Sequence, residues 1–211
     1  MEIIAESGFH NSNKFARIFL ESIQEITGMH GLNAILNYAR LGELIANMPP
    51  DNLQREFDFA WFSMINQALL DIYGDRGGRG LSLRIGRTTF DDVLKDYGNL
   101  AGVGDVAFKI LPMEEKMKFG LSAMARIFSE KSDQLSCLLD EDNQFVYRVK
   151  RCPVCWGRSN NDRPVCYYMV GLLKEGLNWV SGGKEFSVIE TNCLAMGDQS
   201  CDFVINKIPL E

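Results

Sequence analysis

The sequence predicts an α+β fold, in which N-terminal helices pack on a small antiparallel sheet that carries one long late helix. Apolar residues recur three or four positions apart through most of residues 1–130, as in amphipathic helices. Beyond residue 130 they alternate in short segments, as in strands. The chain has 211 residues, so we expect a single domain over residues 1–211, with a mainly helical part (1–130) and a cysteine-rich part (131–211).

Helical spacing predicts the elements of the first part in order. A first helix is expected over residues 14–26, with a stop at Gly28. A second helix should cover residues 32–46 and end before Pro49-Pro50, because proline supplies no amide donor and restrains the residue before it.

Three further helices are expected before the pattern changes. One runs over residues 57–73, and a glycine-rich segment, 74–80, should connect it to another over residues 81–97 through glycines at positive φ. A helix before this segment and the absence of a Walker Lys-Ser/Thr argue against a phosphate loop. Pro112 is expected at the first position of the next helix. One face of that helix carries Met113, Met117, Leu121, Met124 and Phe128.

Alternation predicts the strands of the second part. Residues 144–150 read as a strand, paired with residues 133–139 across an acidic turn. A helix is expected over residues 165–180, ended by Gly182-Gly183. Two more strands follow, over residues 186–190 and 202–205.

The charge balance limits the classes of function. The chain has 22 basic and 28 acidic residues, so its net charge of −6 is unlike that of a general nucleic-acid binder. No apolar run approaches the ~20 residues of a membrane span. The first residues lack the basic and apolar regions of a signal peptide, so we expect a cytoplasmic protein. No Ser/His/Asp or Cys/His arrangement is visible, and we assign no catalytic residue.

Cysteines dominate the last sixty residues. Basic residues outnumber acidic ones around them, between residues 144 and 184. Thiolates suit zinc or an iron–sulfur cluster, and C-x2-C spacing lets two ligands converge on one ion. The alternatives are buried reduced cysteines that pack as small apolar residues, and a redox C-x2-C pair. The cysteines concerned are Cys152, Cys155, Cys166, Cys193 and Cys201, whereas Cys137 lies apart.

Predicted secondary structure favours their convergence. Glu190 should end one strand and Cys201 open the next, and Gly197-Asp198 should form the turn between them. Cys166 falls in the first turn of the late helix, where the helix dipole favours a thiolate.

Two stretches of the C-terminal part resemble a known family. Residues 165–171 (VCYYMVG) and 186–201 (FSVIETNCLAMGDQSC) are similar to the 4-vinyl reductase domain, and the resemblance covers about residues 144 to 207. This family is related to bacteriochlorophyll 4-vinyl-reductase-like proteins, to the sensory domains of phenol-responsive activators and, more distantly, to subunits of the TRAPP complex. In the sensory members a Cys, a Glu and two further Cys hold zinc. The resemblance therefore implies zinc on Cys166, Glu190, Cys193 and Cys201, with Cys152 and Cys155 as possible additional ligands.

The resemblance also implies a hydrophobic pocket between the sheet and the preceding helices, and a homodimer. Only two histidines are present, His10 and His30, both far upstream, so the His-and-Trp phenol clamp of the sensors cannot be transferred. Each pocket candidate could equally be ordinary core, because Met and aromatic residues at helical spacing usually serve packing. The candidates are Phe108, Met113, Met117, Phe119, Met124, Phe128, Tyr147, Tyr168 and Trp179.

Three classes of function are compatible with these features. The first is a sensor or carrier that binds a small hydrophobic molecule, aromatic or tetrapyrrole-like, and has a structural zinc site. The second is an enzyme or accessory factor of (bacterio)chlorophyll 4-vinyl reduction that uses an iron–sulfur cluster, since no dinucleotide or flavin fingerprint is present. The third is a protein-interaction module, with residues 14–46 as a dimer face. For all three we expect neither direct nucleic-acid binding nor a membrane span.

Overall fold

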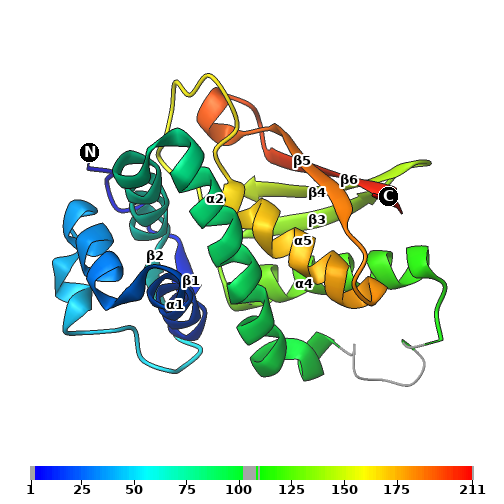
Figure 1. Cartoon of the computed structure of the whole chain (residues 1–211), viewed down its shortest axis with the longest axis horizontal. Helices are drawn as coiled ribbons and strands as arrows, with labels where there is room; N and C mark the ends of the chain where they lie inside the picture. Colours follow the sequence, from blue (N-terminus) through cyan, green and yellow to red (C-terminus); the bar gives the residue numbers. More distant parts are fainter. Residues whose placement is uncertain (1–2, 102–107, 109, 211) are drawn as a thin grey trace.

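The structure is a computed structural model that describes residues 3–101, 108 and 110–210. It confirms the α+β class: long helices cover one part of the chain, and a four-stranded antiparallel sheet forms the other (Figure 1). Within these residues, no helix combines the length and apolarity needed to cross a membrane.

Helix α1 (Asn13–Tyr38) joins the two helices predicted at the N-terminus. Gly28, at φ 74°, forms the expected break between them. The second of the two ends at Tyr38 instead of continuing to residue 46. The cause is Arg40, which adopts a left-handed φ of 59°. The chain then turns into a 3-10 helix, η1 (Gly42–Ile45).

A two-stranded sheet was not predicted. Strand β1 (His10–Ser12) pairs antiparallel with β2 (Arg55–Asp58), so the helix expected from residue 57 begins at Phe59. Asp58 marks this boundary, because its Oδ1 accepts a hydrogen bond of 2.7 Å from the Ala60 amide and so satisfies a free donor of the first turn.

Helix α2 (Phe59–Ala101) corrects the reading of the glycine-rich segment. Only Gly74 in this segment has a positive φ, 69°, and bends the chain there, whereas residues 75–80 are helical. Gly78 explains part of this composition. A Cβ at this position would lie 2.7 Å from the carbonyl oxygen of Leu69, so the absence of a side chain lets the chain on either side of the bend approach closely.

The second part follows the predicted order. The four-stranded sheet has the order β3-β4-β6-β5, and each neighbouring pair is antiparallel. Pro112 precedes the first helical residue of α4 instead of occupying it. Gly182 and Gly183, both at positive φ, end α5 as expected. The elements are α4 (Met113–Lys131), β3 (Leu135–Asp140), β4 (Gln144–Arg151), α5 (Tyr167–Ser181), β5 (Phe186–Asn192), the 3-10 helix η2 (Leu194–Met196) and β6 (Cys201–Pro209).

Helices α2 and α5 cross with their backbones in contact. A Cβ on Gly86 of α2 would lie 2.1 Å from the carbonyl oxygen of Tyr168, and one on Gly171 of α5 would lie 2.0 Å from that of Leu83. No side chain larger than hydrogen fits at either position. This crossing holds α5 between α2 and the second part of the chain (Figure 1).

One hydrophobic core extends from α1 to β6. The apolar face of α1, including Phe19 and Ile23, is fully buried in it. The helices over residues 14–38 therefore cover the protein's own core. The expected homodimer and the single-domain organisation stay predictions.

The α2–α5 crossing can be tested by adding one methyl group. Gly171→Ala should lower the free energy of unfolding by about 3 kcal/mol, because backbone must shift to admit the Cβ. Gly80→Ala is the matched control, since Gly80 is an exposed helical residue with no atom within 4 Å of its ideal Cβ. That change should stabilise the protein by up to about 1 kcal/mol through helix propensity. Urea unfolding would measure both; equal values for the two variants would contradict a tight crossing.

Candidate metal centre and apolar pocket

Six buried donors from four segments converge at one end of α5. Cys166 is the residue just before α5, Glu190 lies in β5, Cys193 follows β5, and Cys201 begins β6. The five thiols are at most 1% exposed and Glu190 is 8% exposed. We call these six residues the metal centre: Cys152, Cys155, Cys166, Glu190, Cys193 and Cys201. Cys137, on β3, is exposed and is not one of them.

The sulfur atoms lie at distances that suit a tetrahedral ion. Cys166 Sγ is 3.7 Å from Cys152 Sγ, 3.8 Å from Cys201 Sγ and 4.0 Å from Cys193 Sγ. Cys155 Sγ is 3.5 Å from Cys201 Sγ. Because Zn–S bonds are about 2.3 Å, thiolates at the corners of a tetrahedron around zinc lie about 3.8 Å apart.

Two sets of four donors meet this requirement. One is Cys152, Cys155, Cys166 and Cys201, and the other is Cys166, Glu190, Cys193 and Cys201. Within each set, all ligand atoms lie within 4.8 Å of one another. The second set is the one that the family resemblance implied, and the first contains the two additional cysteines.

Backbone hydrogen bonds hold the donors in place. The amide of Cys193 donates to Asp198 Oδ2 at 2.8 Å, and Gly197, at φ 95°, makes the turn that returns the chain to Cys201. The amide of Cys166 donates to Glu190 Oε2, also at 2.8 Å, which ties the start of α5 to strand β5. Asp198 is a supporting residue that the sequence analysis placed only in a turn.

The environment of the centre perturbs its acids. Burial, followed by the charge of Cys193, raises the pKa of Glu190 to about 9. Burial also raises the pKa of the Cys166 thiol, whereas hydrogen bonds from neighbouring thiols, led by Cys155, lower the pKa of Cys193. A divalent cation would stabilise the deprotonated form of all these donors. The arrangement can therefore bind a metal ion through protein ligands alone.

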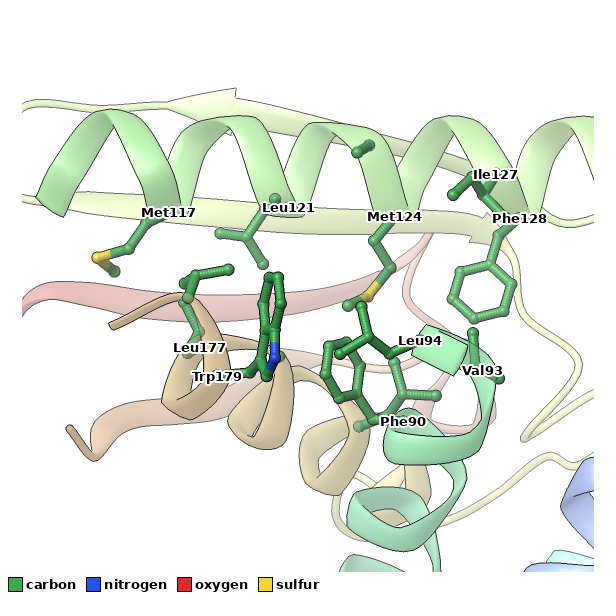
Figure 2. A pocket seen from close by; sticks show the side chains of 15 residues that line it. Phe90, Val93, Leu94, Met117, Leu121, Met124, Ile127, Phe128, Leu177 and Trp179 are labelled. Atoms are coloured by element: carbon green, nitrogen blue, oxygen red, sulfur yellow. The ribbon is translucent and has the colours of Figure 1, made fainter. Parts of the chain in front are cut away.

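An apolar pocket lies between α2, α4 and α5. It contains about 650 Å³ of empty space, its open mouth included, which is within the usual range for small-molecule sites. Figure 2 shows side chains of the three helices directed toward it. Among the described residues of the lining, the indole nitrogen of Trp179 is the one polar side-chain atom. These residues are Phe90, Val93, Leu94, Met117, Gly120, Leu121, Ala123, Met124, Ile127, Phe128, Leu172, Gly176, Leu177, Trp179 and Val180.

Four of the nine pocket candidates line this space: Met117, Met124, Phe128 and Trp179. The structure places the other five elsewhere. Tyr147 and Tyr168 are at most 1% exposed and belong to the core, because β4 and α5 turn them inward. Met113 packs at the edge of that core. Phe108 contacts the ring of Trp179 with their centroids 6.1 Å apart, and the exposed Phe119 lies beside Phe108.

The sequence analysis missed the contributions of α2 and most of those of α5. Phe90, Val93 and Leu94 form an apolar helical stripe, which was a visible signal, but the helix they face could not be read from it. Gly176 keeps the pocket open. A Cβ there would lie 3.0 Å from Met124 Cε and 3.1 Å from Phe90 Cε2.

Comparisons with known proteins identify a domain and a fold. Residues 145–207 match the family model of the 4-vinyl reductase domain, which confirms the resemblance for this segment. The match covers less than half of the chain. The links to phenol-responsive sensors and TRAPP subunits stay predictions. A comparison with curated protein sequences finds no match.

Solved structures of H-NOX proteins superpose on nearly the whole chain. An H-NOX protein from S. oneidensis in the Fe(II)NO ligation state has a TM-score of 0.54 and 12% identity, over 92% of this chain and 99% of that one. The Fe(II) unliganded H-NOX protein from K. algicida has a TM-score of 0.56 and 13% identity, over 95% and 97%. At such identities the likeness shows the fold.

Removal of a shared ligand should release metal. Cys201 belongs to both sets of four, so we expect Cys201→Ser to lose most of its bound metal. Its free energy of unfolding should fall by at least about 3 kcal/mol, because the binding energy of a structural metal is also folding energy. Cys137→Ser is the control, since Cys137 is exposed and outside the centre. Elemental analysis and thermal unfolding would measure both effects; full metal content in Cys201→Ser would contradict this assignment.

Proposed function

We propose that this protein is a sensor or carrier that binds a small hydrophobic molecule in the apolar pocket, and that the metal centre is structural. The observation that carries this proposal is the pocket lining, which is apolar on all three helices. Burial of an apolar ligand there would be favourable by roughly 25 cal/mol per Å² of surface removed from water. The H-NOX fold and the 4-vinyl reductase segment support the same class of function.

Heme does not fit the pocket. The solved H-NOX structures are described as Fe(II) proteins, and heme distortion has been probed in that family. Heme iron in proteins takes a histidine, cysteine or tyrosine ligand, or a methionine together with histidine. Among the lining residues that the structure describes there is no histidine, cysteine or tyrosine, and no Lys or Arg to pair with propionate groups. The ligand class is therefore a hydrophobic, aromatic-type molecule without an iron centre.

Zinc suits the metal centre better than an iron–sulfur cluster. Each set of four protein donors completes a tetrahedron and leaves no open position, which is typical of structural zinc. An iron–sulfur cluster contains several irons and sulfides between its thiolates, which must then lie farther apart than around one ion. The spacings of 3.5 to 4.0 Å consequently favour zinc over the electron-transfer role required for vinyl reduction.

Helix α5 gives the metal a role in ligand binding. Zinc on Cys166 would fix the start of α5 to the β5–β6 connection. Leu172, Gly176, Leu177, Trp179 and Val180, further along the same helix, form one wall of the pocket. The metal would thus hold this wall against α4 without contacting the ligand.

A neutral fluorescent probe, N-phenyl-1-naphthylamine, tests the pocket. The protein should bind it with an increase in emission, because the lining excludes water. Gly176→Leu should weaken binding at least about tenfold, equivalent to about 1.4 kcal/mol, since the new side chain would occupy the space between Met124 and Phe90.

Gly80→Leu is the matched control, because it adds the same side chain to an exposed helical position with free space. Circular dichroism would verify that both variants are folded. Equal probe affinity in folded Gly176→Leu, Gly80→Leu and the unmodified protein would contradict the assignment of this pocket.

A further inference from the structure

The metal centre has more buried donors than one tetrahedral ion can use. The two sets of four donors share two members, Cys166 and Cys201. A single ion bound by one set leaves the other two donors without metal. These are Glu190 and Cys193 in one case, and Cys152 and Cys155 in the other.

Glu190 is the donor whose surroundings demand a further partner. Its side chain is 8% exposed, and Oε2 accepts the Cys166 amide hydrogen bond. Oε1 is buried and has no hydrogen-bond partner within the described part of the chain. Leaving a buried carboxylate oxygen unpaired is costly, and a cation is a natural partner for it.

We propose that the metal centre binds two divalent ions of the zinc class, bridged by the thiolates of Cys166 and Cys201. Cys152 and Cys155 complete the tetrahedron of the first ion. Glu190 and Cys193 complete that of the second. Two four-coordinate ions require six ligands when two of these are shared, which is the ratio found in Zn₂Cys₆ modules.

The spacing of the donors matches this division. The two bridging sulfurs are 3.8 Å apart. Cys152 lies 3.7 Å from Cys166, and Cys155 lies 3.5 Å from Cys201, so each outer thiol of the first ion adjoins a bridge. Cys193, on the second ion, is 4.0 Å from both bridging sulfurs.

Charge gives a second reason for two ions. The six donors, when deprotonated, carry six negative charges inside a buried volume. Two divalent ions offset four of these charges, whereas one offsets only two. Uncompensated buried charge is destabilising, so the second ion lets Glu190 and Cys193 remain ligands in their charged forms.

This inference rests on the metal centre of the proposed function and is independent of the pocket. The test is metal counting on the whole chain, reconstituted with zinc under anaerobic, reducing conditions. Elemental analysis and native mass spectrometry should find two zinc ions per chain, and cadmium NMR of the cadmium-substituted protein should give two resonances. Cys152→Ser/Cys155→Ser and Glu190→Gln/Cys193→Ser should each lose one of the two ions. Cys137→Ser should keep both.

One zinc ion per chain at saturation, or a single cadmium resonance, would overturn the proposal. So would iron accompanied by acid-labile sulfide. If a double variant does not fold, the count on the unmodified protein decides. A protein that binds two ions but not N-phenyl-1-naphthylamine would refute the pocket alone, and the reverse result would refute the two-ion centre alone.

Discussion

The contact between the backbones of α2 and α5 is the constraint on which the rest of the structure depends. It requires glycine at both Gly86 and Gly171, because a Cβ at either position would overlap a carbonyl group of the other helix. The close crossing fixes α5 along its length. Its first end then meets strands β5 and β6, where the thiols gather, and its second half faces α4 and Phe90 across the apolar pocket.

Helix α5 thereby belongs to both candidate sites. The Cys166 amide and thiol lie at its start, where the amide hydrogen bond to Glu190 ties the helix to β5. Gly176 and Trp179 lie further along the helix, in the pocket wall. A helix of this length moves as one body, so a metal at one end restrains the wall at the other. This is a mechanical link between fold stability and ligand binding that needs no contact between metal and ligand.

The comparison with H-NOX structures separates fold from chemistry. The chain shares that fold over nearly its full length at 12 to 14% identity, yet the described residues of its pocket lining offer no imidazole, thiolate or phenolate. A fold supplies the space between helices, whereas the side chains decide what can occupy it. The metal-binding chemistry of this chain has instead gathered at the cysteine-rich end of the sheet, in the segment that matches the 4-vinyl reductase domain.

The sequence alone determined features that depend on near neighbours. Helical spacing located the breaks at Gly28 and Gly182, and the spacing of Cys193 and Cys201 around a turn indicated that these thiols converge. Tertiary structure decided the features that join distant segments. The β1–β2 pair joins residues more than forty positions apart, and Phe90 meets Met124 and Gly176 from separate helices. Only the fold showed that Cys152 and Cys155 share two neighbours with Glu190 and Cys193, because metal coordination depends on distances in space, which residue spacing does not fix across separate elements.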